Sequence, residues 1–221
     1  MSKHAANRFS RCQENVAKRT RVEDRTVHTY LYGIWKKFVD IVISLIGLVF
    51  FLPIFPFLAI AIKLDTPGPV FYIQERVGKN GKVFKIYKLR SMVVDAEKNG
   101  AQWADKNDKR VTRVGRFLRK TRLDEFPQLV NVLKNEMSII GPRPERPELT
   151  EEFCEYIAGF ANRLQVRPGL TGWAQVNGGY DLTPEEKFEL DMYYIENRSI
   201  MLDLLIIFKT IGILFTGNGA R

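Results

Sequence analysis

The chain has 221 residues, 45% of them apolar, and this size predicts one folded domain with at most a short appendage. Its formal net charge of +9 predicts a surface that attracts anions, which include nucleic acid, acidic lipid head groups and phosphorylated substrates. The only histidines are His4 and His28, and no cysteine and histidine spacing typical of a zinc site occurs. Any acid, base or nucleophile in the body of the chain must therefore be a carboxylate, lysine, tyrosine or hydroxyl.

The N-terminal part divides into a basic arm and an apolar segment. Residues 1–35 are polar and basic, and we predict a mobile or interfacial arm there. Ile41–Ile62 has no charge over 22 residues, which at about 1.5 Å each in a helix reach about 33 Å, enough to cross the hydrocarbon core of a bilayer. A cleaved signal peptide would have a shorter apolar run followed by a small-residue cleavage site, and neither fits. We therefore predict a membrane helix over 36–64.

Basic residues flank this segment at both ends. A pair of lysines precedes it, and Lys63 begins a second basic stretch that continues to Arg90. Under the positive-inside rule both flanks are cytoplasmic, which a straight span cannot satisfy. Pro53 and Pro56 lie near the middle, where proline removes a backbone hydrogen bond and kinks the helix. A bent helix that enters and leaves on one side satisfies both observations, and an ordinary kinked span is the alternative.

Downstream, the residue patterns predict an α+β fold that is mainly helical with a small β-hairpin. The last apolar helix contains Asp203 and Lys209, so we expect it to lie in the membrane interface rather than to cross the bilayer. In chain order the expected elements are a hairpin of Val70–Val77 and Val83–Leu89 joined by Gly78–Gly81, a polar loop over Asp95–Lys109, a helix around 114–118, a helix from Asp124 to about Met137 that ends before Gly141–Pro144, a helix near 148–160, another near 184–197, and the apolar helix Ile200–Phe215.

Asp124 and Glu125 form a carboxylate pair at the start of a predicted helix, directly after a stretch rich in arginine and lysine. The ordinary explanation is helix capping by Asp124, with Glu125 favoured by the helix dipole. Beside several cations, and in a chain without a suitable histidine, the pair also fits two chemical roles. An aspartate can attack phosphorus and form an acyl phosphate, and carboxylates can hold Mg²⁺.

Five basic residues are candidate phosphate ligands. Arg143 lies between two prolines, which restrict the backbone and leave its guanidinium few competing conformers. A guanidinium binds phosphate through two parallel hydrogen bonds, although a mere helix-ending turn is the alternative. Arg167, followed by Pro168-Gly169, repeats the arrangement with the same ambiguity. Lys85, Lys88 and Arg90 form either a phosphate-facing row or a solvated, lipid-facing edge of the hairpin.

Taken together, these segments resemble the bacterial sugar transferase family of monotopic phosphoglycosyl transferases, over about Lys36 to Phe215. Each matching block is short, but their order and spacing are specific. The blocks are Lys37-Phe38-Val39-Asp40, Phe84-Lys85-Ile86-Tyr87-Lys88-Leu89-Arg90-Ser91-Met92, Leu123-Asp124-Glu125-Phe126-Pro127-Gln128-Leu129, Met137-Ser138-Ile139-Ile140-Gly141-Pro142-Arg143-Pro144, the run from Arg167-Pro168-Gly169 through Thr171-Gly172-Trp173 to Gly178, and Phe188-Glu189-Leu190-Asp191-Met192-Tyr193-Tyr194.

The resemblance implies a topology. By it, 36–64 is a re-entrant helix-break-helix, and 65–221 is a catalytic domain on the cytoplasmic face of the bacterial inner membrane, with a C-terminal interfacial helix. The family often has Ser-Pro at the break, whereas this chain has Leu52-Pro53. Pro53 is therefore the expected break, without the contribution of a serine hydroxyl.

The resemblance also implies a reaction. Asp124 would attack the sugar-linked phosphorus of a UDP-sugar and release UMP, and undecaprenyl phosphate would then take the phosphosugar from the carboxylate. Glu125 would help Asp124 to hold Mg²⁺, the expected cofactor, or assist proton transfer. The candidate substrate-binding residues are Lys88, Arg119, Arg143, Asp191, Lys85 and Arg167. The expected partners are the donor, the lipid acceptor and the bilayer, and a homodimer is compatible with the sequence.

Two other classes of protein compete with this interpretation. A nucleic-acid binder would explain the positive charge but not the uncharged segment, so we expect no nucleic-acid partner. A membrane scaffold without enzymatic activity would explain the segment but not a carboxylate pair among cations. No motif contains a side chain that can be assigned to one sugar, so the sequence does not identify the sugar, the pathway or the oligomeric state.

Overall fold

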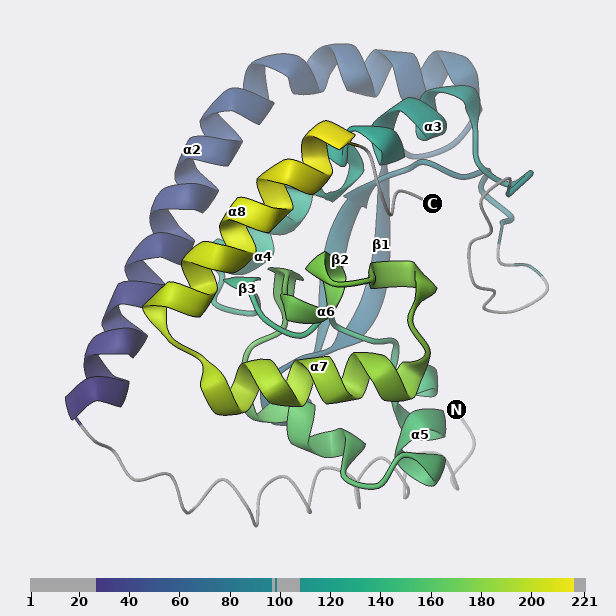
Figure 1. Ribbon diagram of the computed structural model, residues 1–221. Coiled ribbons are helices and arrows are strands. Elements are labelled where there is room, and N and C mark those ends of the chain that lie inside the picture. Colours follow the sequence, from purple (N-terminus) through teal and green to yellow (C-terminus); the bar gives the residue numbers. More distant parts are fainter. Residues whose placement is uncertain (1–26, 97, 99–107, 217–221) are drawn as a thin grey trace.

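The computed structural model describes residues 27–96, 98 and 108–216, whose helices and short strands are drawn in Figure 1. Residues 1–26 of the predicted arm and most of the predicted loop Asp95–Lys109 lie outside this part. The mainly helical architecture with small sheets confirms the predicted class. In chain order the elements are α2 (Val27–Asp65), β1 (Phe71–Val77), η2 (Lys79–Gly81), β2 (Val83–Leu89), α3 (Arg113–Lys120), η3 (Leu123–Gln128), α4 (Leu129–Leu133), β3 (Ser138–Ile140), α5 (Pro147–Tyr156), η4 (Phe160–Gln165), β4 (Gly169–Thr171), α6 (Trp173–Val176), η5 (Gly179–Asp181), α7 (Pro184–Asn197) and α8 (Ile200–Thr216), where η marks a 3₁₀ helix.

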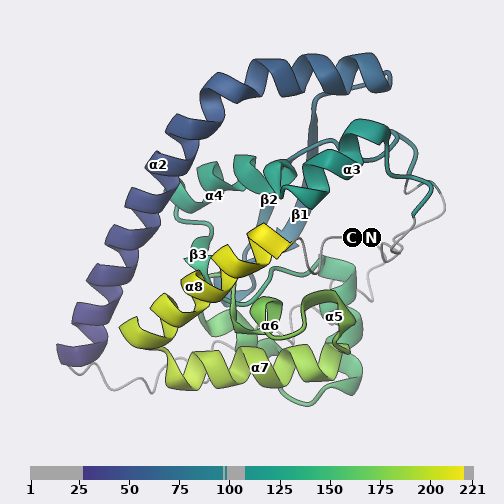
Figure 2. The ribbon, with the colours of Figure 1, turned by 45° about the horizontal axis from the view of Figure 1, so that its top comes forward.

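Helix α2 is one continuous helix of 39 residues that contains both Pro53 and Pro56. It begins at Val27, ahead of the predicted boundary at residue 36, and its early turns already pack against the protein, since Tyr32 is buried. The first part of α2 runs along one side of the molecule, and its later part bends and crosses over the top (Figure 1, Figure 2). Proline inside a helix is a common cause of such a bend.

Most of the apolar surface of α2 is exposed. Among the described residues, Tyr30–Asp65 is the one helix long and apolar enough to cross a membrane, and its most apolar window has a mean hydropathy of 2.7 with 17% of it buried. Helix α8 lies beside α2 and also exposes large apolar side chains, including Met201 and Phe208. Contiguous exposed apolar surface of this kind marks a region that contacts membrane or protein, so these helices are compatible with membrane association.

Buried polar groups tie the inner side of α2 to the rest of the fold. Asp40 Oδ1 accepts hydrogen bonds from Ser138 Oγ at 2.9 Å and from the Ile139 amide at 2.8 Å. One turn earlier, Lys36 Nζ donates to Asp203 Oδ2 of α8 at 3.1 Å. Breaking a buried pair by removing one partner is costly, so these contacts fix α2 against β3 and α8.

Strands β1 and β2 form the predicted antiparallel hairpin. Its register runs from Phe71 opposite Leu89 to Val77 opposite Val83, and Asn80 makes the turn at a φ of 56°, a left-handed conformation that asparagine tolerates. Phe84 and Ile86 are buried on the inner face of β2. Because side chains alternate along a strand, Lys88 shares this inner face and points toward η3.

The helix predicted from Asp124 to about Met137 is wrong in its extent. A 3₁₀ segment, η3, comes first, α4 then ends at Leu133, and Asn135 adopts a φ of 63°. Ser138–Ile140 form β3, which pairs in parallel with β4. A strand of three residues, only two of them apolar, is too short to show a period that separates strand from helix, so the pattern could not reveal it.

The three C-terminal helices are confirmed: α7 has the predicted bounds, α8 ends one residue later, at Thr216, and α5 ends earlier than expected, at Tyr156. The helix expected near 148–160 is α5, after which Gly159 turns at a φ of 80° into η4. Helix α7 covers the residues expected near 184–197, and it begins with a capping box in which the Thr183 and Glu186 side chains each bind the other's backbone amide. The main buried cluster lies between β2, α4, β3, α7 and α8, and includes Ile86, Val132, Met137, Ile140, Tyr194 and Ile206.

Candidate active site

The carboxylate pair lies in η3 rather than at the cap of a regular helix. Arg122 precedes the segment with a φ of 58°, a left-handed conformation that turns the chain out of α3, and its carbonyl accepts the Glu125 amide at 3.1 Å. Phe126 then packs against Phe51 of α2, and their ring centroids are 5.5 Å apart. The sequence-based capping role of Asp124 is therefore wrong, because no regular helix begins there and its position is fixed by this short 3₁₀ turn.

Glu125 brings two predicted phosphate ligands together. Its Oε1 accepts a hydrogen bond from Lys88 Nζ at 2.9 Å and an ion-pair contact from Arg143 Nη2. Lys88 comes from β2 and Arg143 from the turn after β3, so three distant segments meet at one carboxylate. Burial opposes ionisation of Glu125, but Arg143 and Lys88 outweigh it and hold the pKa of this carboxyl well below its usual range.

Asp124 has a contrasting environment one residue away. Its side chain is buried, and Oδ1 has no hydrogen-bond partner among the described residues. Burial, helped by the negative charge of Glu125, raises the pKa of Asp124 to about 6, while Lys88 and Arg119 act in the opposite direction. The side chain is therefore mostly ionised at neutral pH yet weakly stabilised as an anion, which favours reaction with an electrophile or binding to a cation.

Arg119 adds positive charge at the edge of the pair. It lies near the end of α3, and its Nε donates to Ser91 Oγ just after β2 at 2.9 Å. Its charge lowers the pKa of Asp124, as does that of Arg122. The site therefore combines one partner-poor carboxylate oxygen with several cations, an arrangement suited to phosphoryl groups.

The comparison with known families supports the same assignment. Residues 31–217 match the family described as bacterial sugar transferase. The chain belongs to the bacterial sugar transferase family. The match extends from the first turns of α2 past the end of α8, so it includes every side chain of the candidate site.

Several relatives in this family carry names that state an activity. The chain is 48% identical over 194 residues to a UDP-N-acetylgalactosamine-undecaprenyl-phosphate N-acetylgalactosaminephosphotransferase of Aeromonas hydrophila, which covers 86% of this chain and 46% of that protein. It is 42% identical over 181 residues to a UDP-glucose:undecaprenyl-phosphate glucose-1-phosphate transferase of Escherichia coli, with 80% and 39% covered. It is 38% identical over 200 residues to an undecaprenyl-phosphate galactose phosphotransferase of Salmonella typhimurium, with 84% and 41% covered. The chain thus spans less than half the length of these relatives.

Three of the predicted substrate-binding residues have other surroundings in this family member. Lys85 is exposed on the face of β2 opposite to Lys88, because side chains alternate along the strand. Arg167 Nη1 lies 3.9 Å from Asp40 Oδ2 of α2. Asp191 is buried and accepts a hydrogen bond from Arg163 Nη2 at 2.6 Å. Lys88, Arg119 and Arg143 remain as predicted residues whose contacts or charges act on the carboxylate pair.

Two contributing side chains, Ser91 and Arg163, had escaped the sequence interpretation. Ser91 orients Arg119, and Arg163 contacts the turn that carries Arg143. Serine and arginine are common at surfaces and neither lies in a pattern of its own, so only the position of Ser91 inside a matching family block gave a signal.

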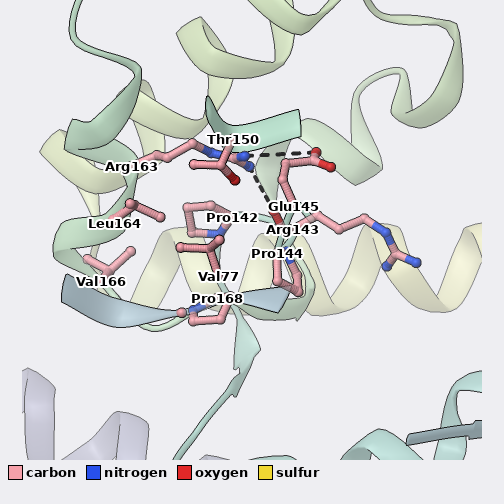
Figure 3. A pocket seen from close by; sticks show the side chains of 11 residues that line it. Val77, Pro142, Arg143, Pro144, Glu145, Thr150, Arg163, Leu164, Val166 and Pro168 are labelled. Atoms are coloured by element: carbon pink, nitrogen blue, oxygen red, sulfur yellow. Dashed lines mark hydrogen bonds and ion pairs between the residues drawn. The ribbon is translucent and has the colours of Figure 1, made fainter. Parts of the chain in front are cut away.

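The small pocket in Figure 3 lies beside the site but does not contain the carboxylate pair. Pro142, Glu145, Arg163 and Val166 contribute to its walls, and the Arg143 side chain points away from it (Figure 3). The pocket therefore lies behind the turn whose outer side presents Arg143 to Glu125.

The carboxylate pair could coordinate a magnesium ion only together with oxygen ligands from a substrate or from water. Within the described ranges, no three histidine, cysteine, aspartate or glutamate side chains cluster as a metal site. Mg²⁺ is commonly held by one or two carboxylates together with substrate phosphates and water, however, and Asp124 Oδ1 is a buried oxygen that lacks a partner. The pair thus fits an ion that arrives with a diphosphate rather than a permanent metal centre.

Proposed function

We propose that this protein transfers a sugar 1-phosphate from a UDP-sugar to undecaprenyl phosphate and releases UMP. The observation that carries the proposal is the buried, partner-poor carboxylate of Asp124 beside Glu125, which gathers Lys88 and Arg143. The names of the relatives from Aeromonas, Escherichia and Salmonella support the same class of reaction.

In the first half of the proposed reaction, an Asp124 carboxylate oxygen attacks the phosphorus that carries the sugar. A bond forms between that oxygen and phosphorus, and the bond from phosphorus to the bridging oxygen breaks, so UMP leaves with the electron pair. Lys88, Arg119 and Arg143 supply positive charge for the diphosphate, whose negative charge shifts to the leaving oxygen. The raised pKa of Asp124 fits this role, because a weakly stabilised carboxylate is a better nucleophile.

In the second half, a phosphate oxygen of undecaprenyl phosphate attacks the phosphorus of the aspartyl phosphosugar. The bond from phosphorus to the Asp124 oxygen breaks, which restores the carboxylate and yields a polyprenyl diphosphosugar. Glu125 stays ionised throughout, since Arg143 and Lys88 keep its pKa low, so its role is to position these cations rather than to exchange protons.

Asp124 and Glu125 are also the residues that would hold Mg²⁺ in the proposed enzyme. When bound, the ion would neutralise charge on the diphosphate oxygens. Its expected ligands from the protein are Asp124 Oδ1, which lacks a partner, and an oxygen of Glu125.

We further propose that α2 enters the cytoplasmic leaflet of the bacterial inner membrane and returns to the same side. Its bend, its internal prolines and the exposed apolar side chains of α2 and α8 support this arrangement. Such a placement would bring the site to the membrane surface, where the phosphate of the lipid acceptor lies, because Phe51 of α2 packs against Phe126 in the segment that carries Asp124.

A UMP-release screen tests the proposal and also identifies the sugar. The purified chain in nanodiscs with undecaprenyl phosphate and Mg²⁺ is offered UDP-glucose, UDP-galactose, UDP-N-acetylglucosamine and UDP-N-acetylgalactosamine separately. We expect UMP and a lipid-linked diphosphosugar with at least one donor, and neither product with Asp124→Asn. Absence of UMP with every donor, from a protein that unfolds cooperatively, would reject the proposed function for this panel of substrates.

A further inference from the structure

The turn that carries Arg143 is held by its backbone carbonyls. Four successive carbonyl oxygens, from Pro142 to Glu145, each accept a hydrogen bond from another part of the chain. The donors are the Gly169 amide to Pro142 at 2.8 Å, Arg163 Nη2 to Arg143 at 2.8 Å, Arg76 Nη1 to Pro144 at 3.0 Å, and the Val77 amide to Glu145 at 2.9 Å. The two prolines have no amide hydrogen, so these carbonyls are the main means by which neighbours fix the turn.

Arg163 is the one of these donors that binds the Arg143 carbonyl itself. Its side chain is 5% exposed, and its guanidinium lies 4.9 Å from the Phe160 ring centroid. The same Nη2 also donates to Asp191 Oδ2 at 2.6 Å, while Nη1 lies 3.8 Å from Glu145 Oε1 (Figure 3 shows the contacts to the turn). Asp191 therefore neutralises a buried cation whose planar fork points at the turn.

The opposite side of the turn presents the Arg143 side chain to Glu125. Gly141 lies so close to the segment before β4 that an added Cβ would be 2.5 Å from the Arg167 carbonyl oxygen, so the start of the turn packs directly against this backbone. With the backbone fixed on both sides, the Arg143 guanidinium starts from one defined position when it reaches toward Glu125.

We propose that the buried Arg163–Asp191 pair positions Arg143 for the reaction by holding its backbone carbonyl. This proposal rests on the proposed function, because it assigns the pair a role in handling the diphosphate without direct contact with the substrate. It replaces the substrate-binding role that the sequence suggested for Asp191. A small displacement of a positioned group can lower a reaction rate about 100-fold, so loss of the pair can lower the rate substantially even though the pair does not contact the substrate.

A kinetic cycle separates positioning from general stabilisation. Arg163→Lys keeps the charge but loses the planar guanidinium, whose Nη2 reaches both Asp191 and the Arg143 carbonyl while Nη1 lies near Glu145. We expect Arg163→Lys alone to lower kcat/KM about 10-fold or more. Added to Arg143→Lys, it should lower kcat/KM little further, because the Arg143 guanidinium that it positions is already absent. Arg90→Lys is the matched control, since Arg90 is another buried arginine that binds backbone carbonyls, those of Ile62, Thr66 and Pro67. Its effect should add to that of Arg143→Lys.

Hydrogen exchange supplies a measurement that does not depend on activity. In Arg163→Lys, peptides that contain the amides of Gly141, Gly169 and Val77 should exchange faster than in the unaltered protein, whereas Arg90→Lys should leave them unchanged. If Arg163→Lys does not fold, Asp191→Asn takes its place, because it keeps the shape and an acceptor oxygen while removing the charge that neutralises Arg163.

The outcomes are distinct. Faster exchange at the turn together with a non-additive cycle supports the proposal. Fully additive losses, or unchanged exchange at the turn in a variant with reduced activity, overturn it. If the unaltered protein releases no UMP but the exchange result holds, the proposed function fails while the structural restraint on Arg143 stands.

Discussion

Phe51 of α2 stacks on Phe126, two residues after Asp124, with ring centroids 5.5 Å apart and planes at 25°. Phe51 is 5% exposed, although many of the large apolar side chains of α2 are exposed. The depth and orientation of α2 are thereby linked to the position of the carboxylate pair. A displacement of α2 would act on the site through this contact.

The first prediction tests that link. Phe51→Ala should lower the free energy of unfolding by about 3–5 kcal/mol, as expected for removal of a buried phenyl ring, and should reduce turnover in the fraction that stays folded. Thermal unfolding in nanodiscs and UMP release measure the two effects. Phe50→Ala is the matched control, because Phe50 is 70% exposed and should change both quantities little. Equal effects of the two variants would contradict the link.

The second prediction concerns the guanidinium fork of Arg143. Arg143→Lys keeps the charge but loses the two-atom contact with Glu125, so kcat/KM for the nucleotide sugar should fall about 10- to 100-fold with little change in thermal stability. Arg116→Lys, on the exposed side of α3, serves as the control. Unaltered kinetics for Arg143→Lys would show that the guanidinium of Arg143 has no role in the reaction and that the residue only forms part of a turn.

The third prediction follows from the pKa of Asp124, which burial raises to about 6 from an unfolded value of about 3.9. The folded protein binds this proton more tightly than the unfolded chain, so the stabilising contribution is complete below about pH 4 and is lost as the pH rises through 6. Asp124→Asn should therefore be more stable than the unaltered protein at pH 7.5 by on the order of 3 kcal/mol, with the difference shrinking toward pH 4. Denaturant unfolding in EDTA checks this.

Asp108 provides a control of opposite sign. The hydrogen bonds from Arg110 lower the pKa of Asp108, so its contribution to stability is present at neutral pH and is lost as the pH falls through the folded pKa. Asp108→Asn should thus be less stable than the unaltered protein at pH 7.5. If Asp124→Asn behaves in the same way, the buried environment assigned to Asp124 is incorrect.

The fourth prediction concerns the topology of α2. In a chain whose natural cysteines are replaced by serine, single cysteines at positions 25 and 82 should both react with an impermeant reagent only from the cytoplasmic side. Labelling of position 25 from the outside would reject the re-entrant arrangement. Pro53→Ala should favour a straighter helix and lower activity, because in the proposed re-entrant arrangement the bend would set the height of the site above the bilayer. Unchanged labelling and activity in Pro53→Ala would show that Pro53 determines neither the topology of α2 nor the position of the site.

The elements that could be predicted from the sequence are those with a repeating local pattern. Alternation of apolar and polar residues predicts the hairpin β1–β2, and capping residues predict the start of α7. Continuous hydrophobicity over many residues predicts the long apolar helices. The strands β3 and β4 have three residues each, and their pairing depends on segments far apart in the chain, so no local pattern reveals them. The left-handed Arg122 likewise has no sequence signature.

The sequence predicts which residues belong to the candidate site but not which of them contact one another. The segments that contain Asp124, Glu125, Lys88 and Arg143 were each identified, yet only the tertiary structure shows Glu125 as the carboxylate that binds both cations. Asp191 lies in a separate matching block, Phe188–Tyr194, and its contact with Arg163 depends on the packing of α7 against η4. Sequence separation gives no indication of such a contact.

The measurement that tests the account most directly is the intact mass of the protein after incubation with donor alone. With the productive UDP-sugar and Mg²⁺ but no lipid acceptor, we expect UMP release that does not exceed the amount of protein, and a mass increase of one sugar phosphate that maps to Asp124. Asp124→Asn should show no adduct and should lower turnover by on the order of 10³-fold or more. An unmodified protein that is fully active under conditions that preserve acyl phosphates would contradict the covalent mechanism and favour direct attack by the lipid phosphate.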